Sequence, residues 1–215
     1  MQKFYLNRVL LESFPYRQSL SKHLNNSMVI QTTMRSKEDD VLEPFFNSSR
    51  QWHFDELLKA AKVSRSQLSQ WLRKFTAAEI IKRVKPKGKM PYYLQNFDNP
   101  EYQQRKRLFA LKKLTESGLL GHLASLQDAK VIILFGSFAS YDWHEGSDID
   151  IFIYGNDKDF EHGKYELKLK KEIQVHTAKN KEDLKKIDRM LPYIIAGDFI
   201  KGSIENLGVE VHGKV

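Results

Sequence analysis

The chain has 215 residues and no cysteine, which excludes a disulfide framework and a thiolate zinc site. Its longest apolar run, Val131 to Phe135, is far too short to cross a bilayer, so no membrane association is expected. The first residues lack the continuous apolar stretch of a secretory signal, and together these features favour a cytoplasmic protein.

The net charge of +8 is unevenly distributed along the chain. Residues 37–113 carry 17 Lys and Arg against 9 Asp and Glu, whereas residues 114–215 carry 13 against 17. This shift predicts two modules with different partners, and a polyanion is the natural partner of the basic one. The alternative is that the basic helices only keep the protein soluble.

Residues 1–36 show no consistent period and are interpreted as a mobile N-terminal extension. A clear helical pattern starts after Ser36, a candidate N-cap that is followed by acidic residues suited to the first turn of a helix. A second helix is predicted over residues 54–63, and a third over residues 64–81 with Ser64 as its N-cap. Two short strands follow, separated by a Pro-Lys-Gly-Lys turn.

The order of three helices and a basic hairpin resembles that of the winged helix-turn-helix family over residues 37–99. The resemblance implies that the third helix enters the major groove of DNA and that the hairpin lysines meet phosphates. Trp52 and Trp71 are interpreted as core residues, and docking of another protein is the alternative role of this domain. The candidate DNA-binding residues are Arg65, Gln67, Gln70, Arg73, Lys85, Lys87 and Lys89.

Residues 100–129 are predicted to connect two domains through a long helix that ends near Ser117 and a shorter one after Gly118. Three leucines form the expected apolar side of the long helix, and its basic residues are expected to form a solvated face. The leucines are Leu108, Leu111 and Leu114, and the basic residues are Arg105, Lys106, Arg107, Lys112 and Lys113.

The last part of the chain, residues 130–215, has the pattern of strands mixed with helices. An apolar run at its start predicts a buried strand, and a strand with strict alternation follows at Asp148. A third strand is predicted over residues 173–178. A helix of two pieces around Pro192 is expected after Asn180, its predicted N-cap.

Two aspartates and a Gly-Ser turn are the candidate functional residues of this domain. The side chains of Asp148 and Asp150 share one face of a strand, and neighbouring carboxylates need a compensating cation, for which Mg²⁺ is the expected ion. Gly136 allows close backbone approach, and Ser137 adds a hydroxyl donor ahead of an expected helix N-terminus, which suits a phosphate. A phosphate site beside a divalent metal predicts a nucleoside triphosphate site.

Gly136-Ser137, ten intervening residues and Asp148-Ile149-Asp150 resemble the signature of the DNA polymerase β superfamily of nucleotidyltransferases. The resemblance implies an α+β protein whose small mixed sheet, flanked by helices, binds two Mg²⁺ through the aspartates and a triphosphate, expected to be ATP, through Ser137. It also implies transfer of a nucleoside monophosphate to an acceptor hydroxyl with release of pyrophosphate. Some minimal members are antitoxins that adenylylate a HEPN-type toxin, which makes such a protein a candidate partner.

The third carboxylate of the family lies on a later strand, where this sequence has Gln174. An amide cannot accept the proton of the acceptor hydroxyl, so Glu172, on the same strand face, is the candidate catalytic carboxylate. Glu166 and an acid from a partner are secondary candidates, and His176 is a candidate general base. Three functions stay open: an active nucleotidyltransferase, a DNA-binding transcription regulator with an inactive transferase domain, and an antitoxin-like protein that masks a partner.

Overall fold

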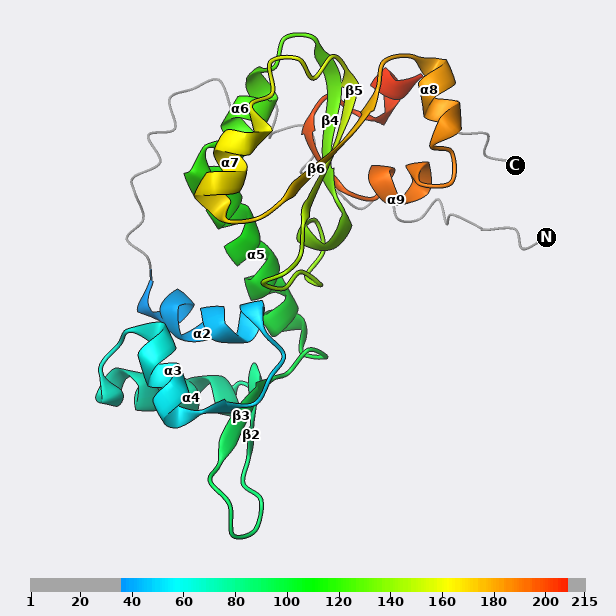
Figure 1. The fold of residues 1–215 in the computed structure, drawn as a ribbon. Helices are drawn as coiled ribbons and strands as arrows, with labels where there is room; N and C mark the ends of the chain where they lie inside the picture. Colours follow the sequence, from blue (N-terminus) through cyan, green and yellow to red (C-terminus); the bar gives the residue numbers. More distant parts are fainter. Residues whose placement is uncertain (1–35, 209–215) are drawn as a thin grey trace, which may run out of the picture. The chain divides into compact units, whose positions relative to one another are not determined.

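The computed structural model describes residues 36–208 of this α+β protein, and residues 37–208 pack as one compact unit with two sheets (Figure 1). The predicted N-terminal extension lies, except for Ser36, outside the described residues. Within the described range, no helix is both long and apolar enough to span a membrane. We call residues 37–95 the N-terminal module and residues 129–208 the C-terminal module.

The N-terminal module combines a three-stranded antiparallel sheet, in the order β1-β3-β2, with three helices. The three predicted helices and both hairpin strands are confirmed, whereas β1 was not predicted. Ser64 caps its helix as expected, since its hydroxyl accepts a hydrogen bond from the Gln67 backbone amide at 3.2 Å. The elements are α2 (Lys37–Asn47), β1 (Trp52–His53), α3 (Phe54–Ala61), α4 (Arg65–Ala77), β2 (Ile81–Val84) and β3 (Tyr92–Gln95).

Helix α4 ends earlier than predicted, at Ala77 rather than Ile81. Glu79 adopts a left-handed backbone with a φ of 56°, and the Ile80 amide donates a hydrogen bond to the Phe75 carbonyl at 2.9 Å. These features close the helix with a C-terminal capping turn. The chain therefore enters β2 directly and buries both Ile80 and Ile81.

Two helices follow the N-terminal module as predicted, α5 (Pro100–Ser117) and α6 (Leu119–Ser125), separated by Gly118 with a φ of 86°. The predicted faces of α5 are only partly confirmed, because Leu114 is buried and Leu111 packs against the core, but other residues differ. Leu108 is 63% exposed, whereas Lys106, which was expected in solvent, is 5% exposed. The buried face is selected by the elements that pack against α5 and not by its leucines. It consists of Tyr102, Lys106, Phe109, Ala110, Leu114 and Ser117.

The other basic residues of α5 form ion pairs instead of the predicted solvated face. Three of them reach acidic residues of α2, and one reaches the last strand of the C-terminal module. Each partly exposed pair contributes at most about 1 kcal/mol, but together they compensate the positive charge of α5 inside the protein. The pairs are Arg105–Glu38 at 2.7 Å, Arg107–Asp198 at 2.5 Å, Lys112–Asp39 at 3.1 Å and Lys113–Glu43.

The C-terminal module contains a four-stranded mixed sheet in the order β6-β5-β4-β7, with β5 and β6 parallel and the other pairs antiparallel. The three predicted strands are confirmed, as is the cap at Asn180, whose side chain accepts hydrogen bonds from two backbone amides. The helix predicted to continue from there is wrong over Asp198–Lys201, which form β7. A side chain at Gly197 would collide with the Leu134 carbonyl, so this glycine lets the chain approach β4 and pair with it. The elements are β4 (Ala129–Phe135), η2 (Gly136–Phe138), β5 (Ile149–Gly155), α7 (His162–Leu169), β6 (Ile173–Ala178), α8 (Lys181–Lys186), α9 (Leu191–Ile195), β7 (Asp198–Lys201) and η3 (Ile204–Leu207).

Each face of this sheet has its own core. Helices α5, α6 and α7 lie on one side of the sheet, and α8 and α9 lie on the other (Figure 1). Ile149 and Ile151 of β5 belong to the first core, which continues into the N-terminal module. Phe152 and Tyr154 belong to the second, beside α8 and α9. Because side chains alternate along a strand, Asp150 faces the second side.

Candidate active site

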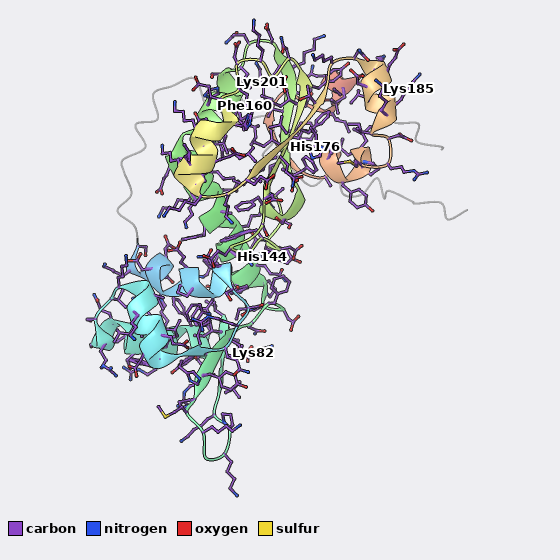
Figure 2. All side chains as sticks on the ribbon, in the orientation of Figure 1. Lys82, His144, Phe160, His176, Lys185 and Lys201 are labelled. Carbon is purple, nitrogen blue, oxygen red and sulfur yellow. The ribbon has the colours of Figure 1, made fainter. Side chains whose placement is uncertain are left out.

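Asp150 lies at the centre of the candidate site because of the register of three strands. It is paired with Phe135 at the end of β4 and with Gln174 on β6, and Asp148 comes immediately before β5. His176 shares this face of the sheet, and its ring meets that of Phe135 edge-on, with 5.5 Å between centroids (Figure 2). The two aspartates, the end of β4 and the start of β6 therefore meet at one end of the sheet.

Gly136 turns the chain directly against the Asp150 carboxylate. Its φ is 69°, and a side chain added here would collide with Oδ2 of Asp150. The close approach expected of this glycine is present, and its neighbour is a carboxylate of the site. The helix N-terminus expected after Ser137 is absent from the described chain, because residues 136–138 form a single 3-10 turn and the next helix, α7, begins only after β5. Within the described residues, the backbone donors offered to a phosphate after β4 are therefore those of this 3-10 turn and not of a helix.

The two aspartates are crowded negative charges. Burial raises the pKa of Asp150, nearby His176 opposes that rise, and the charge of Asp148 adds to it. A cation relieves this crowding. The carboxylate oxygens of Asp148 and Asp150 are ligands that Mg²⁺ prefers, and one or two carboxylates suffice when substrate phosphates complete the coordination. The residues present therefore fit this ion.

Gln174 lies where the third carboxylate was expected. Its Nε2 donates a hydrogen bond to Oδ2 of Asp148 at 2.7 Å. The amide therefore satisfies one aspartate directly, and it can offer its Oε1 to a cation only after the amide turns over. Among the described residues, no group of three or more His, Asp or Glu side chains is arranged to hold a metal ion.

In the described part of the chain, no hydrogen bond or ion pair joins Glu172 or Glu166 to the two aspartates. Glu172 is exposed just before β6, and its side chain borders a hollow beside α7 together with Glu166. Glu166 has a local role, since its Oε1 accepts a hydrogen bond from the Ile173 amide at 3.0 Å. A catalytic role for Glu172 stays a prediction.

Lys171 is a positioning residue that the sequence analysis missed. Its Nζ donates hydrogen bonds to the carbonyls of His144, Glu145 and Ser147 at 3.0, 2.7 and 3.2 Å. These bonds hold the loop that delivers Asp148 to the site, and burial lowers the pKa of the lysine. No sequence signal distinguishes it, because it lies in a stretch rich in lysine.

The candidate DNA-binding residues of the N-terminal module fall into two groups. Arg65 and Gln67 have partners within the module, because Arg65 pairs with Asp55 at 2.9 Å and the Gln67 side chain accepts a hydrogen bond from the Ser64 amide at 3.1 Å. The other side chains are exposed and have no ion pair or hydrogen bond within residues 36–208. They are Gln70, Arg73, Lys85, Lys87 and Lys89.

Arg83 on β2 is a further exposed cation that the sequence analysis did not include. Together with Arg73 it borders a hollow of about 500 Å³ between α4 and the hairpin. The pairing of β2 with β3 and the packing of α4 bring these two arginines together, and their separation in sequence offered no sign of it.

Residues 120–204 match the sequence model of the family described as Polymerase beta, Nucleotidyltransferase. The matched region contains the Gly136 turn, both aspartates and Gln174. This region is a polymerase beta nucleotidyltransferase domain. The N-terminal module lies outside the match, so its winged-helix identity stays a prediction. No curated protein and no solved structure matched the chain.

The resemblance drawn from the Gly-Ser and Asp-Ile-Asp signature is thus confirmed over the polymerase beta domain. Nucleotidyltransferases of this family typically use Mg²⁺ and a nucleoside triphosphate, so a nucleotide substrate is implied for this domain. The mixed sheet with helices on both sides agrees with that assignment.

Proposed function

We propose that this protein is a Mg²⁺-dependent nucleotidyltransferase that transfers a nucleoside monophosphate from a nucleoside triphosphate, expected to be ATP, to an acceptor hydroxyl. The observation that carries the proposal is the meeting of the Gly136 turn with the Asp150 carboxylate inside a polymerase beta domain. A turn that exposes backbone next to crowded carboxylates suits a triphosphate with its metal ion.

Each residue has a defined role in this proposal. Asp148 and Asp150 would hold Mg²⁺, which would supply positive charge to offset the negative charge of the triphosphate and pyrophosphate. Gly136 and Ser137 bind phosphate oxygens through the backbone and the hydroxyl. The acceptor oxygen attacks the α-phosphorus, the bond from that phosphorus to the bridging oxygen breaks, and pyrophosphate leaves. Glu172 is the proposed acceptor of the hydroxyl proton, which requires movement of the segment before β6.

Label transfer from ATP labelled on its α-phosphate tests the proposal. The protein is incubated with Mg²⁺ and with candidate acceptors, namely itself, tRNA and, where one is encoded by a neighbouring gene, a HEPN-type protein. We expect the Asp148→Asn/Asp150→Asn variant to transfer label at least about 1000-fold more slowly than the wild type. Lys185→Ala, a change at an exposed residue of α8, is the matched control and should retain full activity (Figure 2). No transfer by the wild type to any acceptor contradicts the proposal.

A second candidate function is a DNA-binding regulator, including an antitoxin-like repressor, whose transferase domain binds nucleotide without transferring it. Two observations favour it. Gln174 already donates a hydrogen bond to Asp148, one of the two candidate metal ligands. The side chains of Arg73 of α4 and of the hairpin-turn lysines Lys85, Lys87 and Lys89 are exposed and have no ion pair or hydrogen bond within the described residues.

Binding to DNA from upstream of the protein's own gene, measured at several salt concentrations, tests this second function. Arg73→Ala and Lys87→Ala should each weaken binding and lower the slope of log affinity against log salt by about 1. Lys185→Ala is again the control. Unchanged affinity in both variants would indicate that the N-terminal module docks a protein instead.

A further inference from the structure

A hollow of about 490 Å³ lies where the loop before β5 meets the N-terminal module. The backbone amide of Glu145 in this loop donates a hydrogen bond to the carbonyl of Asn47, the last residue of α2, at 3.0 Å. The volume is within the range of small-molecule sites. The lining residues are Phe45, Phe46, Asn47, Ser48, Ser49, Gln95, Phe97, Lys106, Asp142, Trp143 and His144.

Lys106 brings a buried positive charge to this hollow without a direct ion pair in the described chain. It is 5% exposed, and within the described residues its ammonium has neither a hydrogen bond nor an ion pair. Two aromatic rings lie near its ammonium. Nζ is 5.1 Å from the ring centroid of Trp143 and 5.7 Å from that of Phe97. Burial lowers the pKa of Lys106 to about 8, and Asp142 only partly opposes this. A cation kept at such a cost indicates a missing anionic partner.

Two further polar atoms, each in a residue that lines the hollow, are also without partners within the described residues. Nε1 of Trp143 and Oε1 of Gln95 are buried and form no hydrogen bond within residues 36–208. Buried donors and acceptors are normally satisfied, so each such atom calls for an occupant. The Gln95 amide can present either its oxygen or its nitrogen, whereas the Trp143 indole and the Lys106 ammonium can only donate. Of these three unpaired groups, two can therefore only donate, and the hollow is also lined by the Asp142 carboxylate, which can only accept.

We propose that this hollow binds a small ligand that carries a carboxylate or phosphate group, with Lys106 and Trp143 as its hydrogen-bond donors. Phe45, Phe46 and Phe97 provide an apolar wall for the remainder of the ligand. The site is separate from the candidate nucleotide site, because its donors come from α5 and from the loop and not from the Gly136 turn.

The occupant would contact the loop that links the two halves of the nucleotide site. Trp143 is 2% exposed and stacks on Phe138, the third residue of the Gly136 turn, with 5.4 Å between centroids and 18° between planes. On its other side it lies parallel to Phe109 of α5, at 6.2 Å and 8°. Figure 2 shows His144, the next lining residue, at the end of the sheet that faces α2. A ligand here would fix this loop against the N-terminal module.

Thermal unfolding of the full chain without Mg²⁺ tests the site independently of any transferase activity. Inorganic phosphate and benzoate are titrated separately, each against sodium chloride at equal ionic strength. We expect a saturable rise in Tm with at least one of them, and the responding probe shows whether the ligand group is a phosphate or an aromatic carboxylate. No rise beyond that in chloride, with either probe, overturns the proposal.

Variants separate a binding role of Lys106 from a structural one. Lys106→Met keeps the length of the side chain without its charge, so it should raise the Tm of the ligand-free protein and weaken probe binding at least about tenfold. Lys185→Met, on the exposed face of α8, should change neither. A lower ligand-free Tm together with an unchanged probe response would show that Lys106 is structural, and the proposal would be wrong.

Two more variants complete the test. One keeps it valid if Lys106→Met fails to fold, and the other shows whether the probe binds at the nucleotide site instead. Trp143→Phe keeps the stacked ring but removes the indole donor, so probe affinity should fall several-fold. The Asp148→Asn/Asp150→Asn variant should retain the full probe response, whether or not the wild type proves to be a transferase. Loss of the response in the aspartate variant would place the anion at the Gly136 turn and overturn the proposal.

Discussion

The C-terminal module concentrates like charges, whereas the N-terminal module spreads them out. Asp148 and Asp150 are two residues apart at the start of one strand, and the Asp150 carboxylate is half-buried against the Gly136 turn. Arg73 and the hairpin lysines occupy exposed positions on α4 and around the turn between β2 and β3. Crowded carboxylates are relieved by one compact divalent cation, while dispersed cations suit an extended polyanion such as nucleic acid.

Helix α5 shows why a count of charges is a poor guide to such partners. Its basic residues contribute to the positive charge of the middle of the chain, yet Arg105, Arg107, Lys112 and Lys113 are paired with acidic residues of the same protein. Cations still available to a polyanion include Arg73 of α4 and Lys85, Lys87 and Lys89 around the hairpin turn. Predictions about both regions can therefore be made residue by residue.

Among single substitutions, the largest effect is expected from Gly136→Ala, which changes the backbone next to Asp150. The added methyl group collides with the Asp150 carboxylate at a backbone φ of 69°, so nucleotidyl transfer should fall at least about 100-fold and the free energy of unfolding by about 1–3 kcal/mol. Gly121→Ala is the matched control, since nothing lies within 4 Å of a methyl group added at that position in α6. Label transfer and urea unfolding check the pair, and DNA affinity should be unchanged in both variants. Equal activities would show that the close approach at Gly136 is irrelevant to transfer.

Lys106 is a buried charge that belongs neither to the paired aspartates nor to the exposed cations. The effect of Lys106→Met on the free energy of unfolding should depend on pH. Its pKa is about 8 in the folded protein and ordinary, near 10.5, in the unfolded chain. Between these values the unfolded chain binds more protons than the folded protein. The destabilisation caused by burying the ammonium of Lys106 therefore decreases as the pH rises. The free energy of unfolding of Lys106→Met should therefore exceed that of the wild type by about 2–3 kcal/mol below pH 8, and the difference should shrink toward pH 10.5.

Urea unfolding of both proteins at pH 7.5, 9 and 10.5 measures that difference. Asp142 and His144 also border the hollow, and both are present in the two proteins, so the comparison isolates the change at position 106. A difference that is constant with pH would contradict the burial of an unpaired ammonium.

Gln174→Glu is expected to strengthen the binding of Mg²⁺ by Asp148 and Asp150. It replaces the amide that donates to Asp148 with a third carboxylate, so the variant should be about 1 kcal/mol less stable without metal and gain more Tm from Mg²⁺ than the wild type does. If the domain is catalytically competent, label transfer should also rise about tenfold. Gln127→Glu, in an exposed loop, is the control. No added response to Mg²⁺ would mean that Gln174 does not border the metal site.

The smallest effect is expected from a substitution among the exposed cations of the N-terminal module. Arg83→Ala should weaken DNA binding about fivefold and lower the salt slope by about 1, because this arginine has no internal partner in the described chain. Lys112→Ala should leave DNA affinity unchanged, since Lys112 is paired with Asp39 at 3.1 Å. Filter-binding at two salt concentrations compares them. Equal losses in both variants would show that ion pairing does not decide which cations meet DNA.

Much of the fold could be predicted because it depends on neighbours in sequence. Ser64 and Asn180 cap helices as expected, and β6 has its predicted bounds, Ile173–Ala178. Sequence patterns failed to predict segments whose structure depends on contacts with residues far away in the sequence. β1 and β7 are short strands that exist only through pairing with β3 and β4, so their own residues carry little signal.

The candidate site also contains features that local sequence predicts and features that depend on tertiary contacts. Strand alternation alone predicts that Asp148 and Asp150 share a face, and the match to the polymerase beta family supports the importance of that signature. The hydrogen bond from Gln174 to Asp148 spans 26 residues, and the three bonds of Lys171 span 24 to 27. Neither follows from local sequence, because both depend on the parallel pairing of β6 with β5.

By itself, then, the sequence determined the caps, the hairpin and the Gly-Ser and Asp-Ile-Asp elements, all of which act within a few residues. Tertiary structure alone decided that Lys106 is buried beside Trp143, that Arg105 pairs with Glu38 across 67 residues, and that the Gly136 turn touches Asp150. The physical reason is that burial and ion pairing depend on which surfaces come together. A helix such as α5 offers several faces that are nearly equivalent in sequence, and only its neighbours select one.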